Sequence, residues 1–259
     1  MLIVLSPAKS LDFDPAPDGA PATERSFQKD TEILSKTARQ LSRRRLGELM
    51  SISPDLARLN FERFQAFDPD STGGLQAAFA FDGDVYVGLQ ARTMDAKALA
   101  WTQDHVRILS GLYGLLRPMD RIQPYRLEMG ARLKTRRGSS LYDFWGDKIS
   151  KALNAAAEGH EDRTLVNLAS QEYFGAVDAR ALKLPVLNIR FLEEKDGEAR
   201  VISFFAKTAR GRMARWAAEH GLERAGDLKG FDADGYRFSP HASSDAEWTF
   251  SRPQPPLKN

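Results

Sequence analysis

Continuous apolar runs mark the predicted strands of this chain. Residues 2–5 read Leu-Ile-Val-Leu, and comparable runs occupy residues 165–168 and 186–191. Hydrophobicity without alternation is typical of strands that are covered on both faces. The pair Asp196-Gly197 predicts a hairpin turn leading to residues 201–203, and short strands are expected at residues 236–239 and 248–251.

Helical spacing of apolar positions marks the remaining elements. Within residues 142–158, Trp145, Ile149 and Leu153 recur every fourth residue, which is the stripe of an amphipathic helix. Similar patterns predict helices at residues 24–46, 55–67, 94–104 and 204–220. Residues 14–22 are rich in Pro, Asp and Gly and are expected to form a loop, and residues 252–259 a flexible tail.

The order of these elements predicts the α+β class. Helices and short strands are intermixed without the regular alternation of a doubly wound sheet, so we expect a single mixed α/β domain with a central sheet. At 259 residues the chain has a length compatible with one domain, and no linker divides it after residue 22. We expect residues 1–259 to form one domain and the protein to be a monomer.

Composition excludes several chemistries. The chain has no cysteine, which rules out disulfides, iron–sulfur clusters, thiolate zinc sites and cysteine nucleophiles. The histidines are scattered along the chain and match no metal-binding spacing: His105, His160, His220 and His241. We therefore predict no metal and no cofactor. The apolar start is too short for a signal peptide and no later run reaches the length of a membrane span, so a cytoplasmic protein without membrane contact is expected.

Charge is unevenly distributed although the net charge is only +2. Residues 36–63 carry seven basic and three acidic side chains, and residues 117–148 carry eight and four, so each segment has a net charge of +4. Residues 206–216 carry four basic side chains and no acidic one. Three basic segments that meet in the fold would form a basic cleft for a polyanion. The alternative is that each is a solvated helix face.

The segment 105–130 is the most unusual in composition. Glycines flank Leu112 and Tyr113, and the stretch ends in Arg117-Pro118. Glycine at such positions indicates a close backbone approach or a left-handed conformation. Beyond it, Tyr125, Arg126 and Glu128 place an aromatic ring, a guanidinium and a carboxylate within four residues. On a loop these groups serve binding or catalysis more often than packing, and the alternative is a core turn followed by a surface ion pair.

Residues 36–67 contain a candidate helix-hairpin-helix element. The arginine-rich helix leads into Ser51-Ile52-Ser53, Ser53-Pro54 suits the start of a second helix, and Ala57 follows. Free backbone N–H groups at a helix start attract phosphate. Serines stand where such hairpins usually have glycine, and Asp55 would repel an anion, so a plain helical hairpin is the alternative.

Two further segments carry candidate binding groups. On the helix at residues 204–220, Lys207, Arg210 and Gly211 share a face away from the apolar stripe, and the glycine between two cations indicates a phosphate approaching closely. At residues 167–174, polar side chains follow a buried strand, where Ser170 suits a helix cap and Glu172 is a candidate functional acid. An ordinary first-turn carboxylate is the alternative for Glu172.

Several motifs together resemble the YaaA family of peroxide stress proteins. The resemblance runs from residue 1 to about residue 250 and is carried by Ser6-Pro7-Ala8-Lys9, residues 109–130, 142–147, 167–174 and 202–210. It implies a single mixed α/β domain with a basic cleft and a helix-hairpin-helix element, DNA binding, and a role in limiting oxidative DNA damage and free intracellular iron. The positions that match the family's recurring polar residues are Lys9, Arg117, Tyr125, Arg126, Lys207 and Arg210.

Three functions remain open from the sequence. The first is sequence-tolerant DNA binding, with phosphates on Ser51, Ile52, Ser53 and the basic groove and with Tyr125 stacking on a base. The second is an enzyme acting on a damaged base, nucleotide or related phosphorylated substrate, for which the candidate catalytic residues are Tyr125, Glu128 and Glu172. The third is direct iron sequestration, which the lack of cysteine limits to a carboxylate-rich site.

Overall fold

A mixed, mostly parallel sheet forms the centre of the molecule in the computed structural model, which describes residues 1–256. Its strand order is β11-β12-β9-β8-β1-β5-β6, with β10 paired to β9. Strands β12, β9, β8, β1 and β5 run parallel to one another, whereas β6, β10 and β11 pair antiparallel with β5, β9 and β12. The predicted mixed α/β fold with a central sheet is confirmed.

The strands of this sheet follow the apolar runs of the sequence. Their bounds are β1 Leu2–Leu5, β5 Val106–Ser110, β6 Gly114–Leu116, β8 Leu165–Leu168, β9 Val186–Lys195, β10 Glu198–Arg200, β11 Arg237–Phe238 and β12 Glu247–Pro253. Strand β1 is buried throughout because β5 and β8 flank it and helices cover the sheet. Two small sheets pair β2 Ser10–Leu11 with β4 Phe81–Asp82, and β3 Leu75–Gln76 with β7 Arg121–Ile122.

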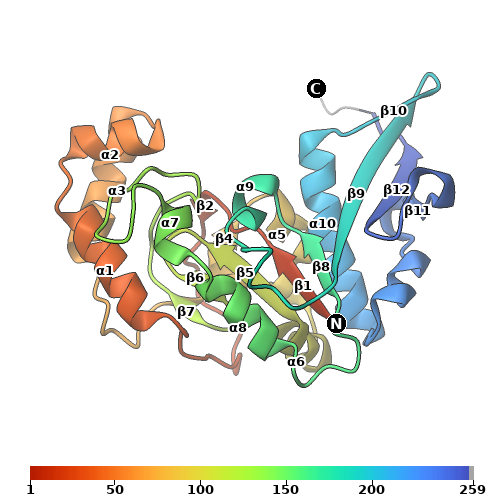
Figure 1. The fold of residues 1–259 in the computed structure, drawn as a ribbon, viewed down its shortest axis with the longest axis horizontal. Coiled ribbons are helices and arrows are strands. Elements are labelled where there is room, and N and C mark those ends of the chain that lie inside the picture. Colours follow the sequence, from red (N-terminus) through yellow and green to blue (C-terminus); the bar gives the residue numbers. More distant parts are fainter. Residues whose placement is uncertain (257–259) are drawn as a thin grey trace.

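Helices cover both faces of the sheet and form a lobe at one end (Figure 1). The lobe consists of α1 Gln28–Arg39, α2 Arg43–Met50 and α3 Pro54–Ala66. The other helices are α4 Ala77–Ala80, α5 Asp84–Leu89, α6 Ala96–His105, α7 Leu141–Trp145, α8 Lys148–Ala156, α9 Gln171–Phe174 and α10 Ser203–His220. Short 3-10 turns are η1 Ala91–Thr93, η2 Ala225–Gly230, η3 Ala233–Gly235 and η4 Pro240–Ala242. None of the helices within residues 1–256 is long and apolar enough to cross a membrane.

Two predicted helices are each divided in two. The helix predicted at residues 24–46 ends at Arg39, and Ser42 starts α2 by accepting a hydrogen bond from the N–H of Arg45 at 3.3 Å. The helix predicted at residues 142–158 is interrupted at Gly146, where φ is +49°. The prediction of single helices was wrong because local caps stop a helix even where the apolar spacing continues.

The tail predicted to be flexible is ordered in its first part. Strand β12 extends to Pro253, which pairs with Glu194, and the N–H of Gln254 donates to the carbonyl of Glu194 at 2.9 Å. The side chain of Arg252 is 9% exposed and lies 3.4 Å from the buried carboxylate of Glu193. The prediction was therefore wrong for residues 252–254, and residues 257–259 lie outside the described residues.

The glycines of the central segment have the two roles that were expected. A Cβ at Gly111 would collide with the backbone of Leu127, so this glycine permits a close approach of two chain segments. Gly114 has φ +72°, and a Cβ there would lie 2.7 Å from the ring of Trp145. Gly111 thus lets the turn between β5 and β6 approach the backbone at Leu127, and Gly114 lets it pack against Trp145 of α7.

Candidate functional site

A cleft lies at the carboxyl ends of β1 and β8. Residues Ser6 to Lys9 follow β1, and Ala169 and Ser170 lead from β8 into α9. The Oγ of Ser6 accepts a hydrogen bond from the N–H of Ser170 at 2.9 Å, which holds the two strand ends together. Within the central sheet, the next strand after β1 in the chain is β5, which lies on one side of the β1–β8 pair. The next strand after β8 is β9, which lies on the other side. Ligand sites of parallel sheets lie where the strand order reverses in this way.

This strand-end cleft brings together most of the predicted site residues. It is a hollow of about 500 Å³ with a small adjoining hollow of about 10 Å³, and Pro7, Ala8, Lys9 and Tyr173 line both. The predicted residues that line them are Lys9, Tyr125, Arg126, Glu128, Glu172, Lys207 and Arg210. Segments that are up to two hundred residues apart in sequence therefore meet here.

The charges in the strand-end cleft are mixed rather than basic. Among residues 1–256, four cations line it, Lys9, Arg126, Lys207 and Arg210, together with four acids, Asp82, Asp84, Glu128 and Glu172. The guanidinium of Arg126 contacts the carboxylate of Glu128 at 2.9 Å, with Lys9 3.7 Å from the same oxygen. Lys207 lies 3.6 Å from Asp84 at the start of α5. Ion pairing leaves little net positive field for a polyanion at this cleft.

Two buried polar atoms of the strand-end cleft lack a hydrogen-bond partner among the described residues. They are Oε2 of Glu128 and Nε of Arg210. Burial lowers the pKa of Arg210 from its ordinary value. Because an unpartnered buried polar group is costly, groups of this kind indicate a place for water or a small polar ligand.

Glu172 and Tyr125 are held in different ways. Oε1 of Glu172 accepts a hydrogen bond from the N–H of Gly130 at 2.9 Å, while the residue itself is exposed. Tyr125 is 5% exposed, and its hydroxyl lies 2.7 Å from Oγ of Ser110. Burial raises the pKa of Tyr125 well above its ordinary value. Its ring packs edge-on against Tyr113 and is not accessible for stacking on a base in this conformation.

The remaining predicted residues lie away from the strand-end cleft. Arg117 follows β6, which runs back along β5, so it lies toward the amino ends of the parallel strands. There it contacts the buried carboxylate of Asp120 at 3.1 Å. Ser51, Ile52 and Ser53 connect α2 and α3 in the end lobe (Figure 1). The structure thus separates the hairpin from the cleft with which it was predicted to act.

The hairpin has the local geometry expected from its sequence. Ser51 has φ +51°, the left-handed conformation in which glycine is usual, and Ser53 caps α3 by accepting from the N–H of Leu56 at 3.4 Å. Pro54 is the first residue of α3, as predicted. A groove of about 690 Å³ runs along the hairpin, and Arg43, Arg44 and Arg58 line it beside Glu48 and Asp55. A helix-hairpin-helix function for this element remains a prediction.

Gly211 has a structural role that differs from the phosphate approach we expected. It is buried, and a Cβ on it would collide with the carbonyl of Val85 and lie 2.8 Å from the N of Leu89 in α5. Gly88 of α5 faces the backbone of α10 in the same way. The pair of glycines allows α5 and α10 to pack backbone to backbone, and this contact positions Asp84 and Lys207 at the cleft.

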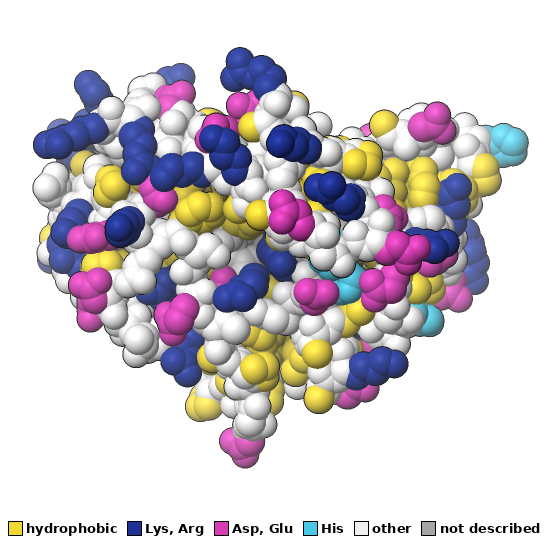
Figure 2. Space-filling view, turned by 60° about the horizontal axis from the view of Figure 1, so that its bottom comes forward, with side chains coloured by type: hydrophobic (Ala, Val, Ile, Leu, Met, Phe, Trp, Pro, Cys, Tyr) yellow, Lys and Arg dark blue, Asp and Glu magenta, His cyan; other side chains and the backbone are white. Residues whose placement is uncertain are grey.

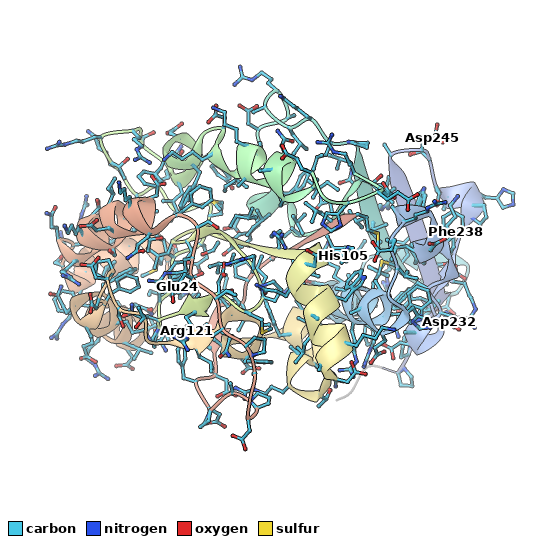
Figure 3. All side chains as sticks on the ribbon, turned by 90° about the horizontal axis from the view of Figure 1, so that it is seen from below. Glu24, His105, Arg121, Asp232, Phe238 and Asp245 are labelled. Atoms are coloured by element: carbon cyan, nitrogen blue, oxygen red, sulfur yellow. The ribbon has the colours of Figure 1, made fainter. Side chains whose placement is uncertain are left out.

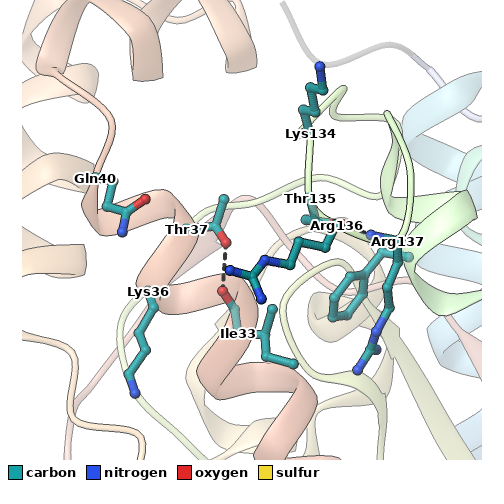
Figure 4. A pocket seen from close by; sticks show the side chains of 9 residues that line it. Ile33, Lys36, Thr37, Gln40, Lys134, Thr135, Arg136 and Arg137 are labelled. Carbon is teal, nitrogen blue, oxygen red and sulfur yellow. Dashed lines mark hydrogen bonds between the residues drawn. The ribbon is translucent and has the colours of Figure 1, made fainter.

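A second groove lies between α1 and the loop at residues 131–138 (Figure 4). It has a volume of about 700 Å³, and its lining includes Lys36 of α1, Gln40 directly after this helix, and Lys134, Arg136 and Arg137 of the loop. Ile33 and Phe144 supply an apolar floor. No acidic side chain is among the described lining residues. Two of the three predicted basic segments therefore converge here, at what we call the basic groove.

The positive charge of the basic groove is evident from the contacts of Arg137 and from the charged side chains on the surrounding surface. Arg137 lies 4.4 Å above the ring of Phe144 and contacts Asp30 at 2.5 Å, so it is fixed in place. Lys and Arg side chains crowd the part of the surface over the α1–α3 lobe, with Asp and Glu side chains interspersed among them (Figure 2). Lys134 and Arg136 were not predicted as site residues, although the charge of segment 117–148 was their signal.

Comparison with known proteins identifies the family. A profile of the peroxide stress protein YaaA family matches residues 1–242. The chain belongs to the peroxide stress protein YaaA family. Similar members are UPF0246 proteins: one of Phenylobacterium zucineum is 70% identical over 99% of this chain and 96% of its own, and one of Caulobacter vibrioides is 62% identical over 98% and 100%. A UPF0246 protein of Maricaulis maris is 54% identical over 98% and 97%. Family membership supports a role in the response to peroxide.

Proposed function

We propose that this protein binds DNA without strong sequence preference as part of the peroxide stress response. The observation that carries the proposal is the basic groove, where Lys134 and Arg136 line the wall opposite Lys36 and no acidic side chain of the described residues lines the channel itself. Two of the lining cations have acidic partners outside the channel, Lys36 with Glu32 at 2.5 Å and Arg137 with Asp30. Cations on opposite walls of a groove are the footprint of a phosphate backbone. In this proposal the protein limits oxidative DNA damage and is linked to lower free intracellular iron, as a cytoplasmic monomer.

The α2–α3 hairpin extends this surface. It belongs to the same lobe as α1, and its own groove carries three arginines, Arg43, Arg44 and Arg58. Free N–H groups at the start of α3 suit a phosphate, although Asp55 in the first turn opposes one. We therefore assign the main contacts to the basic groove and auxiliary contacts to the hairpin.

The test compares paired charge removals in two places. Lys134→Ala with Arg136→Ala removes cations from the basic groove, and Lys207→Ala with Arg210→Ala is the matched control in the strand-end cleft. Fluorescence anisotropy with several duplexes of unrelated sequence gives the affinity at each salt concentration. We expect the groove variant to bind all duplexes more weakly and its log K–log salt slope to flatten by about one for each phosphate that it no longer neutralises. Loss of binding in the control variant alone would show that the DNA binds at the strand-end cleft and not at the basic groove.

A specific observation favours a second function at the strand-end cleft. The buried, unpartnered Oε2 of Glu128 and Nε of Arg210 suit a small phosphorylated substrate, such as a nucleotide or an extruded base, better than a duplex. Incubation with nucleotides and with damaged duplexes, followed by product analysis, tests for a reaction. Glu128→Gln should abolish any product, and absence of product at stoichiometric protein would exclude this function.

A further inference from the structure

Two histidines that are distant in sequence meet at the end of the sheet opposite to the strand-end cleft. His105 is the last residue of α6, directly before β5 (Figure 3). His160 lies in the connection from α8 to β8. Their rings are 4.5 Å apart, with the planes at 63°. Asp104 completes a group in which one ligand atom of each residue lies within 4.8 Å of the other two. The sequence spacing of the histidines, which matches no metal motif, did not predict this pair, because tertiary structure brings the two together.

His105 is oriented by its surroundings as metal-binding histidines are. It is 3% exposed, its ring stacks on Trp101 at 4.2 Å, and its Nδ1 lies 2.9 Å from the carbonyl oxygen of Met1. A carbonyl can only accept, so Nδ1 carries the proton and Nε2 presents its lone pair. An imidazole fixed by an outer hydrogen bond on one nitrogen, with the other free, is the usual arrangement of a metal ligand.

The groups in front of Nε2 are carboxylates at a separation that a metal ion would fill. Asp104 Oδ2 and Glu223 Oε1 each lie 3.6 Å from Nε2, beyond hydrogen-bond distance. Ligand atoms at about 2.0–2.2 Å from a tetrahedral ion are about 3.4 Å from one another. Asp104 is 71% exposed and can rotate to close the remaining gap at little cost.

We propose that His105, His160 and Asp104 bind a divalent first-row transition metal ion, with Glu223 as a further ligand. Two imidazoles and carboxylate oxygens suit zinc, iron or cobalt, and they do not suit magnesium or calcium, which take oxygen ligands only.

This site is independent of the proposed DNA surface. It lies at the amino ends of β1, β5 and β8, whereas the strand-end cleft lies beyond their carboxyl ends and the basic groove lies against α1. A variant of His160 should therefore leave DNA affinity unchanged, and failure of either proposal would not affect the other.

The experiment is a titration of tag-free protein with Co²⁺, followed by visible absorption, and then competition with Zn²⁺. We expect saturation at one Co²⁺ per chain and a thermal midpoint that rises with Zn²⁺, because an ion that binds only the folded state stabilises it. His160→Gln and Asp104→Asn should each weaken Co²⁺ binding at least tenfold. His241→Gln, which changes an exposed histidine of η4, is the matched control and should bind as the wild type does.

The substitutions are made at the more accessible proposed ligands, so that a loss of Co²⁺ binding does not result from unfolding of the variant. His105 is buried and its replacement can destabilise the fold, whereas His160 and Asp104 are more accessible, and circular dichroism checks that their variants fold. Absence of a Co²⁺ spectrum and of a Zn²⁺-dependent thermal shift in the wild type would overturn the proposal. Wild-type affinity in His160→Gln would overturn it as well.

Discussion

At the scale of single residues, Asp30 joins α1 to the loop that forms the other wall of the basic groove and to α8. It lies in the first turn of α1, is 6% exposed, and contacts Nζ of Lys148 at 2.8 Å as well as Arg137. Burial alone would raise the pKa of Asp30, but hydrogen bonds from Lys148 and Arg137 outweigh it, so the pKa is lowered. The carboxylate therefore stabilises the fold while it is ionised.

We expect Asp30→Asn to lower the free energy of unfolding at pH 7 by about 1–2 kcal/mol. The substitution removes the charge-assisted hydrogen bonds that Asp30 accepts from Arg137 and Lys148, which are both partly exposed. The folded-state pKa is below the unfolded value of about 3.9, so this stability is complete above that value and is lost as the pH falls through the folded pKa. Urea unfolding from pH 7 to pH 3 measures it. Asp18→Asn, at an exposed position, is the control, and a difference that stays constant down to pH 3 would contradict the pairing.

Residue identity alone predicted the charged members of the strand-end cleft better than its aromatic member. Lys9, Arg126, Glu128 and Lys207 do converge, because polar groups cluster where buried strands end. Tyr125 has the same loop context in sequence, yet it is buried. Its hydroxyl partner, Ser110, lies fifteen residues earlier, and no local pattern reveals such a tertiary hydrogen bond.

At the scale of elements, the contact between α5 and α10 positions the strand-end cleft. Gly211→Ala would place a methyl group against the carbonyl of Val85, and overpacking of this kind costs about 1–3 kcal/mol. The helices should also move apart and lengthen the Lys207–Asp84 pair. Thermal unfolding measures the first effect. Gly226→Ala, where a Cβ would meet nothing within 4 Å, is the control and should be neutral, and equal stability of both variants would show that α5 and α10 can separate freely.

Element boundaries show why periodicity predicts the kind of structure better than its limits. Apolar spacing correctly placed α3, α6 and α10 within two residues. It joined α1 to α2 because the buried face continues through the break, where Leu34, Ala38 and Leu46 are all buried. Ser42 is a good cap residue, but serine also occurs inside helices, so composition alone does not mark the break.

At the scale of the whole molecule, the site locations follow from topology and could not be predicted from the chain. Basic segments 36–63 and 117–148 meet because α1 packs beside the loop at residues 131–138, whereas segment 206–216 is carried to the other side by α10. In the sequence, all three segments are similarly rich in Lys and Arg. Only the acids that tertiary structure adds, Asp82 and Asp84 among them, distinguish the mixed cleft from the basic groove.

The continuity of the core predicts how the molecule unfolds. One cluster of buried side chains runs from Leu34 and Phe64 in the α1–α3 lobe, through the sheet, to Phe191 and Phe250 near the other end. A core shared in this way favours a single cooperative transition. Asp30→Asn in the lobe and Arg252→Met beside Glu193 should therefore lower the same calorimetric peak, with equal calorimetric and van't Hoff enthalpies. Two peaks, of which Asp30→Asn shifts only one and Arg252→Met only the other, would divide the chain into two independent domains.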